Sequence, residues 1–395
     1  MEIYLLIYIP FILSAYLDFV KTDAKVINRM LWFWVIVFTL FRGLRWETGT
    51  DWVSYLSIFD RSSFSNIFTF SRGNNVVEWG YILINAALKW VNNSYTFFLI
   101  VTNFVILFCY KYFCQKATSY PLISFVLFVL LVQVFPTRQP LSTAIVFLSY
   151  VFLVDKKYLL FFLFVLIGVF IHRGSLIALS LIFIVWFFRK HQVYWWVYAG
   201  LYVISFFATV AYTELSDQLL AIANISGEGA EELLESYSRM TDANSVKGTQ
   251  YGSLSGIILN TIIFGMVLFI SYARKDYIKN KIKGFDLYLA MFALYSIIHN
   301  LLRNSSATGI TEIIGRVSST FNTVPLFLPF IFFYFKDKIK VQRMLVYIVF
   351  IVYSSYLFYR AVPGSTFYKA YLPYTSIFEK DKNVYEDYDP NVQDE

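Results

Sequence analysis

The stretch from Phe41 to Asp60, FRGLRWETGTDWVSYLSIFD, follows directly on an apolar run over residues 27–40. Four charged residues come within ten positions at the end of that run: Arg42, Arg45, Glu47 and Asp51. One such charge costs roughly 2.5–3.5 kcal/mol at mid-bilayer depth, so it persists only where it faces water, protein or a ligand. The stretch therefore predicts one wall of a polar site that opens outside the cell.

The remainder of the chain is apolar enough to cross a bilayer many times. Of its 395 residues, 58% are hydrophobic and only 15% are charged. This composition predicts an all-α polytopic membrane protein with about twelve transmembrane helices, within a range of roughly 11–14. The predicted spans cover residues 3–20, 27–41, 95–114, 120–136, 141–154, 158–172, 174–188, 193–212, 252–273, 285–302, 317–335 and 342–360.

Lysines and arginines between these spans predict the orientation, because basic loops stay on the cytoplasmic side. The basic loops fall at alternate ends of successive spans only if the segment 76–90, which carries Glu78 and Lys89, does not cross the membrane and is instead re-entrant or interfacial. Both termini then lie outside, together with one long extracytoplasmic loop over 213–251. We expect a single transmembrane domain over 1–378 and a polar, acidic, disordered tail over 379–395.

Several function classes lack sequence support. The formal net charge of +7 comes mostly from loop lysines and arginines, so it does not predict nucleic-acid binding. The two cysteines, Cys109 and Cys114, share an apolar run and suggest neither a disulfide nor a metal site. No metal-ligand spacing and no glycine-rich phosphate loop occurs, so we expect chemistry without a metal ion or another cofactor.

Five arginines are predicted at the outward ends of different spans: Arg42, Arg45, Arg138, Arg303 and Arg316. A guanidinium group binds phosphate through two parallel hydrogen bonds and stays charged when partly desolvated. The PTRQP turn around Arg138 also starts a helix, whose N-terminal amides favour an anion. These arginines predict a phosphate site, although each of them alone could instead extend toward lipid headgroups.

Histidines and carboxylates at the same face are candidates for proton transfer and sugar binding. His172 ends a span, and His299 lies one turn before Arg303. Neutral imidazole can take a proton from a sugar hydroxyl, but either histidine could be structural. Asp51 and Glu78 are alternative bases; Asp51 could also cap the helix that follows it.

The chain resembles the EpsG/Wzy group of bacterial polysaccharide polymerases. The resemblance rests on these short motifs: the Arg-Gly-Leu-Arg…Gly-Thr-Asp-Trp-Val-Ser-Tyr run at 42–55, Glu78-Trp-Gly-Tyr81, Arg138-Gln139, His172, Gly315-Arg316…Phe321 and Tyr371-Leu-Pro-Tyr374. One departure concerns the family histidine, which is commonly followed at the second position by Ser or Thr. Here Gly174 holds that position and a serine comes only at 175.

The resemblance implies a metal-independent membrane glycosyltransferase. Such an enzyme moves a growing glycan as a block from undecaprenyl pyrophosphate onto one lipid-linked repeat unit, at the outer face of the cytoplasmic membrane. The product is an O-antigen, capsular or exopolysaccharide, and a chain-length regulator and a flippase of the same pathway are the other expected partners. The alternatives are a flippase of lipid-linked oligosaccharides and a membrane acyltransferase.

Within that reading, the five arginines bind the donor pyrophosphate and stabilise it as it leaves. His172 is the first candidate for the base, followed by Asp51 and Glu78. His299 and Glu47 are candidates for other contacts with substrate.

Overall fold

The computed structural model describes residues 1–49, 51–72, 75–132, 134–135, 138–191, 193–207, 254–301, 318–338, 342–364 and 368–379. The predicted loop 213–251, Arg303, Arg316 and the tail after 379 lie outside these residues. The chain divides into two compact units, which are described separately. The first contains 1–72, 76–176 and 332–395, and the second contains 73–75 and 177–331.

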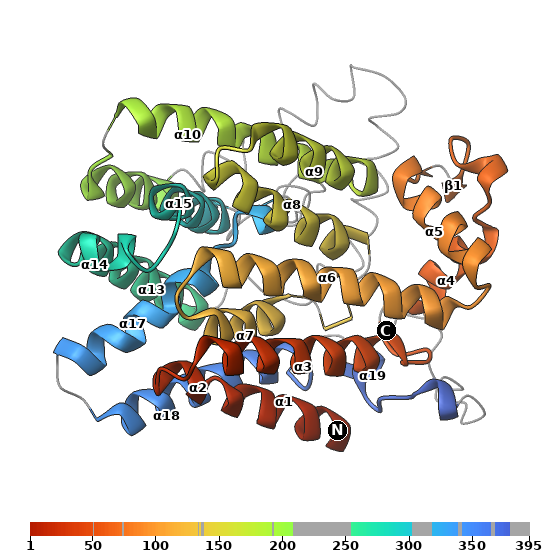
Figure 1. The fold of residues 1–395 in the computed structure, drawn as a ribbon, viewed down its shortest axis with the longest axis horizontal. Helices are drawn as coiled ribbons and strands as arrows, with labels where there is room; N and C mark the ends of the chain where they lie inside the picture. The colour runs from red at the N-terminus through yellow and green to blue at the C-terminus, as the bar shows by residue number, and fades with distance from the viewer. Residues whose placement is uncertain are drawn as a thin grey trace. The chain divides into compact units, whose positions relative to one another are not determined.

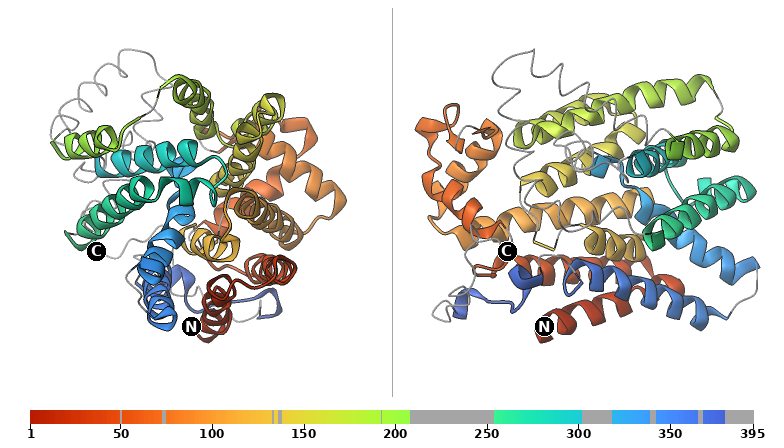
Figure 2. Two further views of the ribbon diagram at one scale, coloured as in Figure 1. Left: turned by 60° about the vertical axis from the view of Figure 1, so that its left-hand side comes forward. Right: turned by 180° about the vertical axis from the view of Figure 1, so that it is seen from behind.

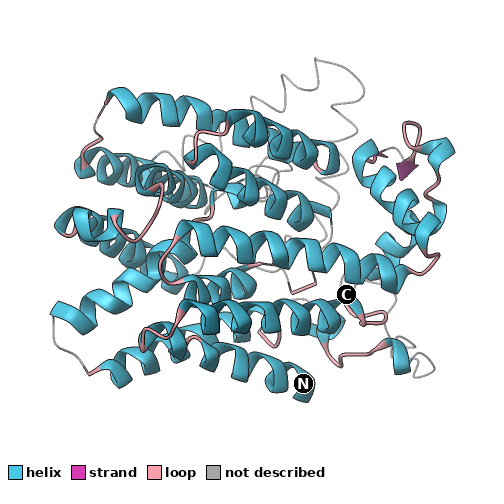
Figure 3. Ribbon diagram, viewed as in Figure 1, coloured by secondary structure: helices cyan, strands magenta, loops and turns pink. Residues whose placement is uncertain are grey.

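The first unit is a bundle of helices whose long members lie side by side (Figure 1). Its main helices are α1 (Glu2–Ser14), α2 (Tyr16–Phe19), α3 (Ala24–Gly43), α4 (Trp52–Arg61), α5 (Trp79–Val91), α6 (Tyr95–Ala117), α7 (Pro121–Leu131), α8 (Arg138–Val154), α9 (Tyr158–Ile171), α18 (Arg343–Ala361) and α19 (Tyr368–Tyr371). Two short strands, β1 (Ser71–Arg72) and β2 (Asn75–Val76), pair between α4 and α5 (Figure 3).

Helices α3 and α6 pack antiparallel. Near the end of α3, Gly43 meets Ile100 close to the start of α6. At the opposite ends of these helices, Gln115 donates a 2.8 Å hydrogen bond to Asn28. The chain thus leaves α3 and enters α6 at the same end of the unit, and α4 and α5 lie at that end (Figures 1 and 2). That the segment 76–90 is re-entrant or interfacial stays a prediction.

Two glycines let neighbouring helices approach closely, as small residues commonly do in membrane bundles. A Cβ atom on Gly80 of α5 would lie 2.6 Å from the carbonyl oxygen of Phe170 in α9. A Cβ atom on Gly168 of α9 would lie 2.8 Å from a methyl group of Val146 in α8. The first turn of α5 and the middle of α8 are therefore held near the last turns of α9.

The second unit is also helical. It contains the end of η2 (Arg173–Ser180), then α10 (Leu181–Lys190), a helix over Trp195–Phe207, α13 (Leu254–Ala273), α14 (Lys275–Lys279), α15 (Phe285–Leu301), η4 (Ser319–Phe321) and the start of α17 (Val324–Lys338). Tyr202 stacks on Phe264 at 3.9 Å between ring centroids, and Asn300 donates a 2.7 Å hydrogen bond to Ser205. These contacts join α13 and α15 to the helix over 195–207.

The predicted helical architecture is confirmed, with the two short strands β1 and β2 as an addition to it. Among the described residues, four helical segments are long and apolar enough to cross a membrane: Glu2–Phe19, Ala24–Gly43, Tyr95–Ala117 and Arg343–Ala361. The other predicted spans overlap shorter apolar helices of 10–17 residues, such as Tyr158–Ile171. A helix shorter than the hydrocarbon core crosses only where the bilayer thins locally or flanking side chains extend to the interface, so the number of crossings stays a prediction.

Candidate active site

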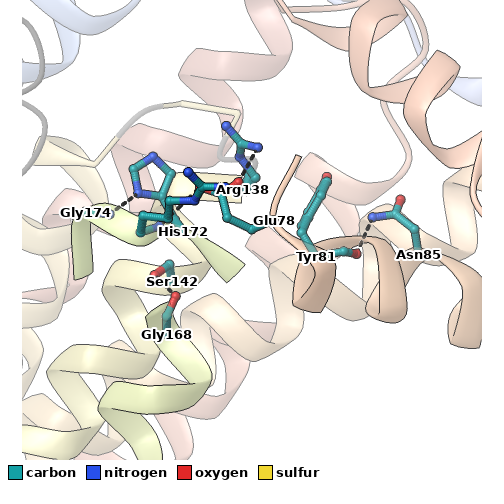
Figure 4. A network of polar contacts seen from close by, with 9 residues as sticks. Glu78, Tyr81, Asn85, Arg138, Ser142, Gly168, His172 and Gly174 are labelled. Atoms are coloured by element: carbon teal, nitrogen blue, oxygen red, sulfur yellow. Dashed lines mark hydrogen bonds and ion pairs between the residues drawn. The ribbon is translucent and has the colours of Figure 1, made fainter. Parts of the chain in front are cut away.

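Three polar residues from three helix ends meet in the first unit, and we call them the rim cluster: Glu78, Arg138 and His172. Glu78 precedes α5, Arg138 begins α8, and His172 follows α9. Arg138 Nη1 lies 2.7 Å from Glu78 Oε2, and the backbone N–H of Arg173 donates to Glu78 Oε1 at 3.2 Å. Figure 4 shows the three side chains in one region. The cluster combines a cation, a carboxylate and an imidazole.

The hydrogen bonding of His172 determines which of its nitrogens carries a proton. The backbone N–H of Gly174 donates to Nδ1 at 3.1 Å, so Nδ1 is an acceptor (Figure 4). Neutral imidazole then carries its proton on Nε2 and can donate from that side. In this arrangement His172 is better suited to donating a hydrogen bond to an oxyanion than to accepting a proton.

A buried pair of serines holds the end of α9 beneath the rim cluster. Ser142 of α8 donates a 2.7 Å hydrogen bond to the carbonyl oxygen of Gly168, and its hydroxyl also contacts that of Ser175. The backbone N–H of Ser175 donates to the His172 carbonyl at 3.1 Å. Ser175 lies one position later than the Ser or Thr that commonly follows the family histidine. Here it positions the turn after His172.

Arg42 and Arg45 belong to a second polar group, and both are buried, with only 1% of each residue exposed. Arg42 Nη2 donates a long 3.5 Å hydrogen bond to the Val129 carbonyl, and Arg45 lies over the Phe135 ring at 4.6 Å. Within the described residues, no carboxylate lies within 4 Å of either guanidinium group. A buried charge without a counter-charge costs on the order of several kcal/mol.

Burial lowers the pKa of Arg45 below its ordinary value, and the nearby hydroxyl of Tyr95 is the largest influence opposing that shift. Tyr95 packs edge-on against Trp52 at 5.4 Å between ring centroids. The hydroxyl of Tyr95, Nε of Arg45 and Nε1 of Trp52 are buried, with no hydrogen-bond partner in the described part of the chain. Donor groups are therefore in excess around Arg45.

A returning segment near the C-terminus covers Arg45. Residues 370–377, here called the C-terminal segment, run beside residues 44–49. The N–H of Trp46 donates to Thr375 at 2.8 Å, the N–H of Ile377 donates to Leu44 at 2.8 Å, and the N–H of Gly49 donates to Ala370 at 2.7 Å. Gly49 has a φ of 109°, and a Cβ atom there would lie 3.1 Å from Arg45 Nη1. The 42–55 motif and the closing Tyr371–Tyr374 motif thus form one local structure.

Tyrosines lie between the rim cluster and the Arg45 group. Tyr81 of α5 lies close enough to Tyr55, Tyr95 and Arg138 to interact electrostatically with each of them. Tyr55 and Tyr81 meet edge-on at 6.0 Å between ring centroids. The arginines at residues 42, 45 and 138 therefore lie toward one end of the first unit. Of these three, Arg138 alone is partly exposed, at 25% of its side chain.

The remaining predicted residues are placed differently. Asp51 is exposed before α4 and makes no capping hydrogen bond, so the capping alternative has no support. Glu47 is half-buried, with a left-handed φ of 46°. His299 lies in the second unit, 3.4 Å from Asn260. The structure therefore brings Glu78, Arg138 and His172 together and leaves His299 in a separate unit.

Sequence reasoning missed two contributors to the rim cluster. The backbone N–H of Arg173 and the hydroxyl of Ser142 carry no sequence signal of their own, because the first is common to most residues and the second is an ordinary helix serine. The role of Gly80 could have been predicted from the sequence, since a glycine inside a short helix commonly marks the close approach of a neighbouring helix. It lies two residues after Glu78 and permits the contact with α9.

The second unit contains an apolar groove of about 390 Å³, lined by side chains that include Trp186, Leu201 and Ile297. Its lining offers almost no polar surface for acid–base chemistry. In the described ranges, no cluster of three or more His, Cys, Asp or Glu residues could hold a metal ion. The rim cluster is therefore our candidate site, and metal independence stays a prediction.

Comparison with known families agrees with the sequence motifs. The model of the EpsG family matches residues 3–376, which is nearly the whole chain. The chain belongs to the EpsG family. Membership in the EpsG family supports a polysaccharide-polymerase type of function in general, and together with the apolar helices it indicates a membrane protein. No curated protein and no solved structure matches this EpsG-family chain.

Proposed function

We propose that this EpsG-family protein joins undecaprenyl-pyrophosphate-linked oligosaccharide repeat units into an O-antigen, capsular or exopolysaccharide. The growing glycan moves as a block onto the acceptor unit at the outer face of the cytoplasmic membrane. The observation that carries the proposal is the rim cluster, in which Arg138 joins a carboxylate and an imidazole at the ends of three helices. Acid–base groups beside a phosphate-binding cation suit glycosyl transfer from a pyrophosphate.

In this mechanism Arg138 binds the donor pyrophosphate at the first turn of α8. The exposed quarter of its side chain leaves it accessible, and the N-terminal end of the helix adds a favourable dipole. Nε2 of His172 supplies a further hydrogen bond to the same anion, because Nδ1 is engaged by Gly174. As the bond from the anomeric carbon to pyrophosphate breaks, these donors stabilise the negative charge on the leaving oxygen.

The acceptor hydroxyl needs a base that can reach it beside the bound donor. His172 as base would require Nε2 to be unprotonated while Nδ1 keeps its Gly174 partner, which neutral imidazole does not allow. Glu78 and Asp51 are the other candidates from the sequence. Glu78 contacts Arg138 directly, and we therefore assign the base to Glu78 and the donor role to His172.

Arg45 is proposed to bind substrate only after the C-terminal segment that covers it is displaced. Arg42, which is buried against Val129, keeps its proposed role as a pyrophosphate ligand. Arg303 and Arg316 keep their proposed role as pyrophosphate ligands, and His299 and Glu47 as further substrate contacts. The chain-length regulator and the flippase of the same pathway remain proposed partners.

The test uses the full-length protein in lipid nanodiscs, supplied with lipid-linked repeat units and read as a glycan ladder on a gel. Arg138→Ala is expected to reduce polymer formation roughly 100-fold or more, as removal of one oxyanion donor does elsewhere. Arg61→Ala is the matched control, since Arg61 donates to the Ser57 carbonyl and lies over the Phe70 ring at 5.2 Å. A normal ladder from Arg138→Ala at equal protein level would contradict the proposal.

Cells that lack the protein separate the polymerase from its alternatives. Loss of a polymerase leaves single repeat units displayed outside, whereas loss of a flippase leaves them inside. Loss of an acyltransferase leaves polymer of normal length that lacks acyl groups. Single units outside the cell are the expected result.

A further inference from the structure

The two oxygens of Glu78 are held by donors from two different elements. Oε2 accepts from Arg138 Nη1 at 2.7 Å, and Oε1 accepts from the backbone N–H of Arg173 at 3.2 Å. A phosphate group presents a pair of oxygens in the same way, and guanidinium groups bind carboxylate and phosphate with similar geometry. The hydrogen-bond donors that hold the Glu78 carboxylate could therefore also bind the oxygens of a phosphate group.

The pair lies where a substrate can reach it. The side chains of Arg138 and Glu78 are 25% and 11% exposed, respectively. Because Arg138 keeps a quarter of its side chain exposed while it is paired, an incoming anion can reach its guanidinium group and compete with Glu78.

We propose that Glu78 acts as an internal stand-in for the donor pyrophosphate and that it becomes the catalytic base only when the substrate displaces it from Arg138. This inference rests on the proposed function and adds the order of events at the same site. While the pair is intact, both oxygens of Glu78 accept hydrogen bonds, from Arg138 and from the Arg173 N–H, so neither faces an acceptor hydroxyl alone. Displacement frees Oε2 beside the bound donor.

The chemical step then balances. The acceptor hydroxyl oxygen forms a bond to the anomeric carbon, and its proton passes to the Glu78 carboxylate. The bond from that carbon to the pyrophosphate oxygen breaks, and its electron pair stays on pyrophosphate, which Arg138 holds. Glu78 later loses its proton to solvent and returns to Arg138 as pyrophosphate leaves. Without bound donor, Glu78 stays paired with Arg138, so it does not take a proton in the absence of substrate.

The experiment measures binding and turnover separately in the full-length protein in nanodiscs. Farnesyl pyrophosphate, a short prenyl pyrophosphate, is the binding probe, and the lipid-linked repeat unit is the turnover substrate. Glu78→Gln is expected to bind the probe about tenfold or more tightly, because the neutral amide competes poorly for Arg138. The same variant is expected to lose roughly 100-fold in turnover, because the amide cannot take a proton.

Asp60→Asn is the matched control, because it removes one exposed carboxylate at the end of α4 without touching Arg138. It is expected to leave both measurements unchanged. Glu78→Asp supplies a second variant with a shorter carboxylate that cannot span both donors, and it is expected to bind the probe more tightly than the parent protein.

The outcomes separate this inference from the proposed function. The proposed displacement of Glu78 by pyrophosphate would be overturned if Glu78→Gln bound the probe as tightly as the parent or less tightly. Tighter binding by Asp60→Asn would overturn it as well. Full turnover in Glu78→Gln would remove Glu78 as the base. Unchanged probe binding in Arg138→Ala would instead contradict the pyrophosphate site of the proposed function. Tighter binding with lost turnover supports the inference.

Discussion

Arg138 Nη1 lies 2.7 Å from Glu78 Oε2, so an ion pair joins the first turns of α8 and α5 across 60 positions of sequence. The pair contributes both to holding α5 in place and to the proposed binding of pyrophosphate. These two roles predict different effects of exchanging its members, because an ion pair tolerates reversal whereas an anion site does not.

Exchange of the pair, Glu78→Arg with Arg138→Glu, is expected to regain stability relative to either single variant. A coupling of about 0.5–3 kcal/mol is typical of contacting charges, and it is measured by thermal unfolding of all four proteins in nanodiscs. Polymer formation is expected to stay absent in the exchanged protein, because a carboxylate replaces the cation at the start of α8. Recovery of the ladder would show that the pair is purely structural.

The close approach of α5 to α9 is expected to be necessary for activity. Gly80→Ala would place a Cβ atom 2.6 Å from a backbone oxygen that cannot move independently, so α5 must shift and Glu78 must leave the Arg173 N–H. We expect a loss of polymer formation of about tenfold or more, measured on the ladder. Gly200→Ala, with nothing within 4 Å of the added atom, is the control and is expected to be neutral.

Hydropathy and the charges at span ends predicted the helical architecture and the gathering of Arg42, Arg45 and Arg138 at one end of the first unit. They did so because helix length and bilayer thickness leave few arrangements for an apolar chain. Helices α3 and α6 pack antiparallel, and residues 44–94, which contain α4 and α5, connect their adjacent ends.

The burial of Arg45 could not be predicted in the same way. It depends on a hydrogen bond between Thr48 and Thr375, which are 327 positions apart, and nothing in local composition identifies such a partner. The protonation of His172 also escaped the sequence, because it depends on the conformation of the Gly174 backbone. Residue types indicated the chemistry, whereas long-range contacts and backbone geometry determine the roles.

Asp18 is expected to stabilise the first unit at the end opposite the rim cluster. Its Oδ2 accepts from the N–H groups of Leu122 and Ile123, each at 2.9 Å, and so caps the start of α7 from another helix. Asp18→Ala would leave two buried donors unpaired and is expected to cost about 2–4 kcal/mol of unfolding free energy. Asp18→Asn keeps an acceptor oxygen and is expected to cost less. Equal thermal stability of the three proteins would contradict the cap.

The proposed orientation can be tested by cysteine labelling, because both native cysteines are buried. Phe68→Cys replaces a residue that is 77% exposed between α4 and α5, and Lys156→Cys replaces an exposed residue between α8 and α9. A membrane-impermeant maleimide is expected to label the first variant in intact cells and the second only after permeabilisation. The reverse pattern would place the rim cluster on the cytoplasmic side.

Arg45 offers a test of whether its burial has a functional origin. An unpaired buried charge is costly, and replacing buried ionic groups with apolar side chains of similar size often raises stability. Arg45→Met is therefore expected to unfold at the same temperature as the parent or higher, while polymer formation falls. Tyr374→Phe, which removes the 2.7 Å hydrogen bond to the Phe41 carbonyl, loosens the C-terminal segment without changing charge. Lower stability with full activity in Arg45→Met would show that the guanidinium group serves packing alone, and the proposed role of Arg45 in substrate binding would be wrong.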